Sequence, residues 1–575
     1  MSRECIPPSA QRNRALRLGL LALLLLLAVG AFVWQRASGG PPPFRPAELD
    51  RAPQTVWQVS GRDDIGAMND AILRTLGRCE TEFAGAYGDL VRGFVPGADY
   101  PMIFIRDTST LLRTASYYYP ADRLGSAVEE FLRRQYDADT RSDEDGLAAG
   151  AGAISAVIAP DGHIDKATAV SDEETHLLHA AYVYYQIVGG QDWLRHEIRG
   201  RPAIERLNDA LEWLYAHRLD GETGLIRRAH TTDWGDVKIE PADNPTDIDP
   251  AHDHWTASIY DQALTYRALH ELAEMNRAVG DTARAEALLE RADRLRERVQ
   301  ALLWQPDKGF FLTHLHLTPL EHPFDESAMV SIANAVAVRC GLADEQQAAS
   351  IFKRLEEARK AAKASKPGVV LYPPYPQGTF AAERMRPGHY QNGALWDWWA
   401  GWQVLAEFEW GQAAMAREHL AQIARDWAAH SGQIFEWQTI GDNVGYGPDD
   451  YAGAAGTVGE AVIGGLFGVR LDRQGIELRP RLGDWPGFIR VYQPSAARYA
   501  AYRYTPTNDA LYLDYGTAGP GPLSLAVLLP SRRPAHEVRL DDNPVEFAME
   551  RIGEDSYALV TDAPAGKHRV TLRLR

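Results

Sequence analysis

The chain has 575 residues, of which 45% are hydrophobic and 24% charged. This is enough to bury one large core and a smaller one, in a composition typical of globular proteins. A net charge of −18 argues against a nucleic-acid backbone as a partner. The three cysteines, Cys5, Cys79 and Cys340, show no zinc-ligand spacing, so they support no zinc site. Nothing in their spacing requires a Cys79–Cys340 disulfide.

The amino terminus has the pattern of a membrane anchor. Residues 1–17 carry four arginines and form the expected cytoplasmic segment. Residues 18–34 are apolar and about long enough to cross a bilayer, which predicts a transmembrane signal-anchor over residues 18–36. Basic residues stay in the cytoplasm, so we expect a single-pass protein of the inner membrane with a periplasmic body. A cleaved signal peptide is the alternative. Residues 37–57 are predicted to be a linker.

Helical periodicity runs through the expected catalytic domain, residues 58–470. Applying the period of 3.6 residues predicts twelve helices, near 63–93, 106–118, 122–137, 172–189, 203–217, 254–279, 282–304, 325–340, 345–361, 390–408, 412–429 and 452–468. Short runs rich in β-forming residues, separated by turns, follow. Residues 471–575 are therefore predicted to form an antiparallel β-sandwich domain.

Unusual polar and aromatic residues are concentrated in alternate loops. Successive helices of a hairpin array run up and then down, so all loops that follow odd-numbered helices lie at one end. These loops and the helix starts next to them hold the candidate functional residues, namely Arg106, Asp107, Glu173, Glu174, Asp233, Trp234, Asp236, His389, Tyr390, Gln391, Asn392, Trp396, Glu436 and Trp437. The loops that follow even-numbered helices are plain turns. A single functional end is predicted.

The order of the helices and the motifs in the loops between them resemble those of the six-hairpin glycosidases. This group includes glucoamylases, glycoside hydrolase family 63, α-L-rhamnosidases and cellobiose phosphorylases. The resemblance covers roughly residues 60–500. It implies an all-α (α/α)6 toroid as the catalytic domain, with its active site at one end and a trailing β domain. The predicted fold class is therefore an all-α toroid with a C-terminal β-sandwich and an N-terminal transmembrane anchor.

Four motifs carry the resemblance. Arg106-Asp107 resembles a pair that holds sugar hydroxyls in subsite −1. Asp233-Trp234-Gly235-Asp236 looks like the phosphorylase motif Asp-Trp-Asn-Asp, whose second Asp is the general acid; this implies Asp236, with Asp233 as the alternative acid. Tyr390-Gln391-Asn392-Gly393 with Trp396 is similar to Tyr-His-Asn-Gly…Trp, with Gln391 in place of the His. Phe435-Glu436-Trp437 looks like the rhamnosidase region that supplies the base, which implies Glu436.

The expected reaction is hydrolysis of an α-linked oligo- or polysaccharide with inversion. Inversion needs a protonated carboxyl beside the leaving oxygen and an ionised one that activates water on the opposite face. Asp236 and Glu436 are predicted as this pair. The substrate-binding residues would be Arg106, Asp107, Glu173, Glu174, Trp234, His389, Tyr390, Gln391, Asn392, Trp396 and Trp437. No cofactor is expected.

Simpler interpretations stay open for these residues. Asp233 and Asp236 are also suited to a helix cap, and Glu173-Glu174 to a helix N-terminus. Asp247, Asp249 and Asp253 are interpreted as part of a solvated acidic loop, with calcium binding undecided. Competing functions are a phosphorylase on the same barrel, a polysaccharide lyase and a non-catalytic glycan-binding protein of the envelope. The expected partners are the saccharide and the membrane, and the sequence leaves the oligomeric state undetermined.

Overall fold

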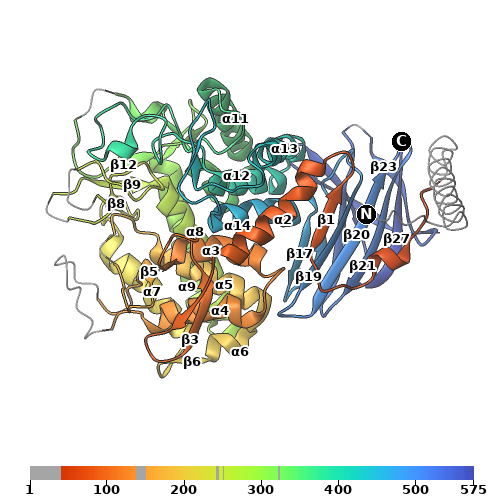
Figure 1. Cartoon of the computed structure of the whole chain (residues 1–575), viewed down its shortest axis with the longest axis horizontal. Coiled ribbons are helices and arrows are strands. Elements are labelled where there is room, and N and C mark those ends of the chain that lie inside the picture. Colours follow the sequence, from red (N-terminus) through yellow and green to blue (C-terminus); the bar gives the residue numbers. More distant parts are fainter. Residues whose placement is uncertain are drawn as a thin grey trace, which may run out of the picture.

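The computed structural model describes residues 41–137, 150–166, 168–240, 245–249, 252–321, 324–531 and 533–575. Helices and several small sheets occupy one side of the molecule, and the two large β-sheets occupy the other (Figure 1). Buried side chains from the helices and from both large sheets belong to one continuous hydrophobic core. Cys79 and Cys340 are free thiols.

Within the described residues, six helices form a closed inner ring in which each contacts the next. They are α3 (Ile105–Ala115), α5 (Glu173–Tyr184), α8 (Ile259–Val279), α10 (Ala333–Arg339), α12 (Asp397–Glu409) and α14 (Ala452–Glu460). Most of their faces are buried; in α12, for example, all positions from Asp397 to Phe408 are inaccessible. Helices that are apolar on all sides belong inside a fold, which explains why these six face one another.

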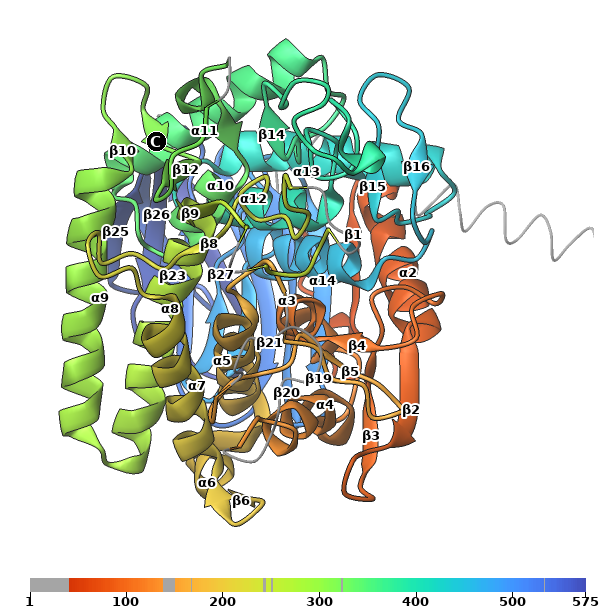
Figure 2. The same cartoon turned by 90° about the vertical axis from the view of Figure 1, so that its left-hand side faces the viewer.

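Six outer helices alternate with the inner ones along the chain and pack against them. They are α2 (Asp63–Arg78), α4 (Ala121–Arg133), α7 (Ala203–Arg218), α9 (Thr282–Leu302), α11 (Glu345–Ala362) and α13 (Ala413–Ala429). Helix α9 shows the pattern: a single stripe of five residues is buried, from Ala285 to Val299 at spacings of three and four, and charged residues face outward. Figure 2 shows the helices around the ring.

Short strands fill the connections that lead from an outer helix to the next inner helix. They are β2 (Glu80–Ala84), β3 (Leu90–Phe94), β4 (Ile103–Phe104), β5 (Val157–Ile158), β8 (Arg228–Ala229), β9 (Trp255–Ser258), β10 (Trp304–Gln305), β11 (Phe310–Phe311), β12 (His314–His316), β13 (Val330–Ser331), β14 (Leu371–Tyr372), β15 (Trp437–Gln438) and β16 (Gly445–Tyr446). The short helices η3 (Glu326–Ala328) and η4 (Glu383–Met385) lie in the same connections. The elaborate loops thus share the side that carries β8, β9 and β12, away from the large sheets (Figures 1 and 2).

The return connections are mostly tight turns. Helix α8 passes to α9 through Gly280, which adopts the left-handed conformation, and Asp281, which caps α9. The connection from α5 to α7 is the exception, because it is long. It contains η2 (Tyr185–Gly189), α6 (Gly190–Arg195), β6 (Glu197–Ile198) and β7 (Arg201–Pro202). After α14, η5 (Ala461–Leu466) leads the chain into the sheets.

Two large sheets follow the helices. The five-stranded sheet has the order β17 (Val469–Asp472), β18 (Gly475–Leu478), β22 (Leu523–Leu528), β26 (Asp555–Val560) and β25 (Phe547–Ile552), with β18 and β22 parallel. The seven-stranded sheet has the order β1 (Val56–Val59), β19 (Gly487–Gln493), β20 (Arg498–Pro506), β21 (Ala510–Ala518), β27 (Gly566–Leu574), β23 (Ala535–Leu540) and β24 (Asn543–Pro544). Strand β1 pairs antiparallel with β19, with Val56 opposite Arg490. It follows η1 (Pro46–Leu49) and precedes the first helix, so the sheet joins both ends of the described chain.

The predicted all-α class is wrong, because the chain is a mixed α and β protein. The residues predicted as one helix over 63–93 show why: α2 ends at Arg78, and β2 and β3 form a hairpin with Glu80 opposite Phe94. A turn that contains Gly88 with φ of +87° separates these strands, a conformation that glycine adopts readily. The predicted domain boundaries at 57/58 and 470/471 stay predictions.

The predicted membrane anchor is a second correction. In the part of the chain that the structure describes, no helix combines the length and the apolar character needed to cross a bilayer. The single-pass anchor, the inner-membrane location and the membrane as a partner therefore have no support. The predicted segment 18–36 itself lies outside the described residues.

Candidate active site

The candidate site lies where the inner helices begin. Arg106 and Asp107 stand in the first turn of α3, Asp236 precedes α8, Gln391 precedes α12 and Glu436 precedes α14. The charge of Asp236 acts on the pKa of Arg106, Asp107 and Glu436, which places these groups in one electrostatic environment.

Gln391 holds Asp236 in place. The Gln391 Nε2 donates to Asp236 Oδ1 at 2.6 Å, and the Gln391 Oε1 accepts from the backbone N–H groups of Asp236 and Val237 at 3.2 and 3.4 Å. Gly235 makes this approach possible, because a Cβ at that position would lie 2.5 Å from Gln391 Oε1. The half-buried Asp236 carboxyl is therefore fixed by one amide that bonds both its side chain and its backbone.

Glu436 is the most perturbed carboxyl of the site. Burial raises its pKa to about 8, and the negative charges of Asp107 and Asp236 add to the effect. The Tyr100 hydroxyl donates to Glu436 Oε2 at 3.4 Å. Gly447, with φ of +71°, passes so close that a Cβ there would lie 2.3 Å from Glu436 Oε2. Glu436 thus keeps a proton near neutral pH in a tightly enclosed position.

Asp107 and Arg106 sit deeper in the same site. Burial raises the pKa of Asp107 to about 6, while a hydrogen bond from Tyr451 and the charge of Arg106 oppose that rise. Arg106 makes a two-point ion pair with Asp172, with Nε–Oδ2 and Nη2–Oδ1 distances of 2.8 and 3.2 Å. A buried Arg in such a fork has a fixed direction, so Asp172 orients Arg106 beside the carboxyls.

Aromatic side chains form one wall near the two carboxyls. The rings of Trp437 and Tyr446 stack with centroids 4.3 Å apart and an interplanar angle of 8°. His389 and Tyr390 pack edge-on against Trp437 at 5.9 and 6.0 Å. The pKa of Tyr390 is raised by burial and then by the charges of Asp236 and Glu436, which places Tyr390 in the electrostatic environment of both carboxyls. Stacked aromatic faces beside polar groups are suited to a sugar ring.

Asp233, the alternative acid, points away from this site into the core. It is fully buried and accepts hydrogen bonds from the Ser258 and Ser331 hydroxyls and from the Tyr260 N–H at 3.2 Å. Burial raises its pKa to about 6. Asp233 has φ of +78°, and its carboxyl ties the loop to α8 and β13. Its contacts are those of a structural carboxylate.

Several other predicted binding residues are also held in internal contacts. Glu173 and Glu174 pair with Lys166 Nζ at 3.3 and 2.6 Å. Trp234 and Trp396 are buried and pack edge-to-face at 4.9 Å. Asn392 bonds the backbone of Tyr375 and Met385. The structure therefore brings together Asp236, Glu436, Arg106, Asp107, Gln391, Tyr390, His389 and Trp437, and places the other predicted residues in supporting positions.

The predicted site residues do not include Tyr100, Asp172 and Tyr451. Tyr100 lies six residues before Arg106 in the same loop, and Asp172 directly precedes α5. Loop parity places both at the functional end, because each belongs to a connection from an outer to an inner helix. For Tyr451, its place next to the start of α14 was the available signal.

We expect Gln391→Ala to lower kcat by about 10²-fold with little change in KM, because small displacements of a reacting group have effects of that order. Asn392→Ala is the matched control: it also removes a buried amide, but one that bonds only backbone atoms away from Asp236. It should lower the unfolding temperature and affect kcat less. Steady-state kinetics and thermal unfolding of both variants check this. Equal losses of kcat in the two variants would contradict a positioning role for Gln391.

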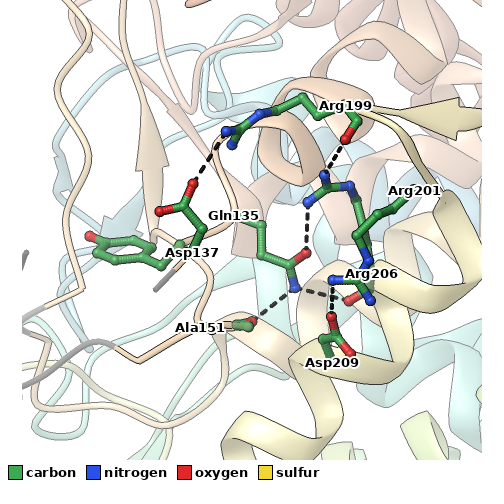
Figure 3. Close-up of a pocket in the computed structure, with 9 residues that line it drawn as sticks. Gln135, Asp137, Ala151, Arg199, Arg201, Arg206 and Asp209 are labelled. Carbon is green, nitrogen blue, oxygen red and sulfur yellow. Dashed lines mark hydrogen bonds and ion pairs between the residues drawn. The ribbon is translucent and has the colours of Figure 1, made fainter. Parts of the chain in front are cut away.

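A separate cavity of about 270 Å³ lies near the start of α7 (Figure 3). Its arginines are already paired: Arg199 with Asp137 at 3.2 Å, and Arg201 with Asp209 at 2.6 Å. Arg206 donates to the Ile198 carbonyl at 2.7 Å. The polar side chains that line the cavity are therefore used in contacts around α7. None of the candidate catalytic residues lines it.

Known structures share this fold. The α-L-rhamnosidase from Dictyoglumus thermophilum matches with a TM-score of 0.60 and 14% identity, over 90% of this chain and 50% of that one. The α-L-rhamnosidase of Streptomyces avermitilis complexed with L-rhamnose matches with a TM-score of 0.56 and 15% identity, over 90% of this chain and 42% of that one. The family 78 rhamnosidase of Bacillus sp. GL1 matches with a TM-score of 0.57 and 15% identity, over 84% of this chain and 43% of that one. The chain spans half or less of these proteins, and such identities show the fold alone.

No curated protein matches the sequence. Residues 147–437, just over half of the chain, match the family model described as the mannosylglycerate hydrolase MGH1-like glycoside hydrolase domain. This match includes Asp236, Gln391 and Glu436 and agrees with the six-hairpin resemblance of the motifs. The chain therefore belongs to the MGH1-like glycoside hydrolase family, within the six-hairpin glycosidases.

Proposed function

We propose that this glycoside hydrolase cleaves an α-linked sugar with inversion, with Asp236 as the general acid and Glu436 as the general base. The observation that carries the proposal is the arrangement of the two carboxyls. Each is held by a different partner, Gln391 or Tyr100, yet the charge of Asp236 raises the pKa of Glu436. The two carboxyls of an inverting pair must share one site and still leave room for a water between the base and the sugar. Separate partners for two carboxyls in one electrostatic environment support that arrangement.

The chemistry follows from these positions. Asp236 gives its proton to the glycosidic oxygen as the bond from that oxygen to the anomeric carbon breaks. In the reactive form the single proton of the pair lies on Asp236 and Glu436 is ionised, so Glu436 can take a proton from water, whose oxygen bonds to the anomeric carbon from the opposite face. The product has the inverted configuration. The reaction leaves Asp236 ionised and Glu436 protonated, so one proton returns from Glu436 to Asp236 through solvent before the next turnover. Arg106 and Asp107 would bind hydroxyls of the sugar, and Trp437 with His389 would contact its ring.

The test is a screen of the protein against aryl glycosides and oligosaccharides, with the anomeric configuration of the first product followed by NMR. The panel contains α-mannosides, mannosylglycerate and α-L-rhamnosides, because the family model and the similar structures carry these names. We expect release of a single sugar with inverted configuration and no dependence on phosphate. A product of retained configuration would refute the inverting pair, and phosphate-dependent turnover would instead indicate a phosphorylase.

A further inference from the structure

A second cluster of titratable side chains lies behind the loop that carries Asp236. His230 follows β8, His314 and His316 lie on β12, and Glu326 begins η3. The three-stranded sheet β12-β9-β8 brings the two strands to the same region. His230, His314 and Glu326 are buried, with 0%, 1% and 5% of their surface exposed. None of them takes part in the proposed hydrolysis, so the cluster needs an explanation of its own.

The distances in this cluster are those of ligands around one ion. One ligand atom from each of His230, His314 and Glu326 lies within 4.8 Å of the others. The His230 Nε2–Glu326 Oε1 distance is 3.1 Å, and the His314 Nδ1–Glu326 Oε2 distance is 4.0 Å, too long for a hydrogen bond. Ligands at about 2.0–2.1 Å from a tetrahedral ion stand roughly 3.3 Å apart. The cluster therefore needs only small shifts to enclose a cation.

The surrounding groups complete the arrangement. The Tyr375 hydroxyl lies 3.3 Å from both His230 Nε2 and His314 Nδ1. His316 Nε2 lies 2.6 Å from Glu326 Oε2, which is too close for two ligands of one ion and typical of a hydrogen bond that orients a ligating carboxylate. His314 thus turns its Nδ1 toward the cluster. Among the described residues, its other ring nitrogen, Nε2, has no hydrogen-bond partner.

We propose that His230, His314 and Glu326 bind one divalent transition-metal ion, with Zn²⁺ the best match. Two imidazoles and one carboxylate suit Zn²⁺, whereas Ca²⁺ and Mg²⁺ prefer sites made of oxygen ligands. Water or the Tyr375 hydroxyl occupies the fourth position. The ion would join three segments, and His230 lies six residues before Asp236 in the same loop. Its role is to fix that loop against β12 and η3.

The test uses the full chain without an affinity tag, stripped of metal by a chelator and titrated with ZnCl₂. We expect about one zinc per chain by calorimetry and elemental analysis, with visible absorption bands of tetrahedral Co²⁺ on cobalt substitution. Saturation at a hundredfold excess over Kd should raise the unfolding temperature by about 2 °C. Hydrogen exchange of residues 228–240 should become slower.

His314→Gln and Glu326→Gln should each abolish zinc binding. His419→Gln is the matched control, since His419 is a buried imidazole between Glu407 and Glu356 and should leave zinc binding unchanged. If the cluster variants fail to fold, stoichiometry and cobalt spectra of the wild type still decide the question. Absence of bound zinc in the wild type, or unchanged binding in the folded cluster variants, overturns the proposal. Either result leaves the hydrolase proposal intact, because Asp236 and Glu436 lie outside the cluster.

Discussion

Asp236→Asn is expected to lower kcat/KM by about 10²–10⁴-fold on a substrate with an alcohol leaving group, the usual contribution of a general acid. Fluoride or a dinitrophenolate leaves without a proton, so the same variant should keep most of the activity on those glycosides. The Asn carbonyl can still accept the hydrogen bond from Gln391 Nε2, so the fold should persist. Kinetics on paired substrates of one sugar provide the measurement.

Asp233→Asn is the control for this prediction. Its carboxyl bonds Ser258, Ser331 and the Tyr260 N–H in the core, so the change should lower the unfolding temperature and alter kcat/KM of the folded enzyme little. The acid would be Asp233 if the loss of kcat/KM were confined to substrates with an alcohol leaving group in Asp233→Asn and showed no such selectivity in Asp236→Asn.

Glu436→Gln should remove activity on both kinds of substrate, by about 10³-fold or more, because no leaving group replaces the activation of water. In the wild type, kcat/KM should fall as the pH rises through about 8, the pKa to which burial and the charges of Asp107 and Asp236 raise Glu436. The reason is that the working pair must hold one proton, and above that pH it loses the last one. Constant kcat/KM up to pH 10 would contradict this.

The same group affects stability in a defined direction. Its pKa rises from an ordinary 4.5 to about 8 on folding, so between these values the folded protein binds more protons than the unfolded chain. The free energy of unfolding must then decrease as the pH rises across that window. Glu436→Gln removes this contribution, and its unfolding temperature should exceed that of the wild type by an amount that grows from pH 5 to pH 8. Thermal unfolding at several pH values tests the sign.

The pattern of apolar residues located most of the helices, because the outer ones bury one stripe at helical spacing and the inner ones are buried on most sides. It missed the short helix α6. All twelve predicted segments contain a helix, although the starts are misplaced where the site residues lie. The segment predicted from residue 390 begins only at Asp397. Tyr390 and Gly393 have φ of +45° and +96°, which no helix accommodates.

Side-chain direction was the part of the site that sequence could not provide. Asp233 and Asp236 lie three residues apart in one loop, and their difference arises from Ser331 and Gln391, about a hundred residues or more further along the chain. Likewise, Glu173 and Glu174 are at a helix start as predicted, yet Lys166 holds both of them inside. Loop parity predicts which end of the barrel a residue occupies, whereas only tertiary contacts decide whether it faces the site or the core.

Strand β1 also makes the barrel and the sheets inseparable in folding. It pairs with β19 along its whole length and leads directly into α2, so the first outer helix is covalently attached to the edge of the seven-stranded sheet. A protein cut after residue 470 would expose an unpaired strand with the buried side chains of Trp57 and Val59, a template for aggregation. Unfolding should accordingly be one cooperative transition. The β region is therefore expected to be required for folding of the helical barrel and not to be separable from it.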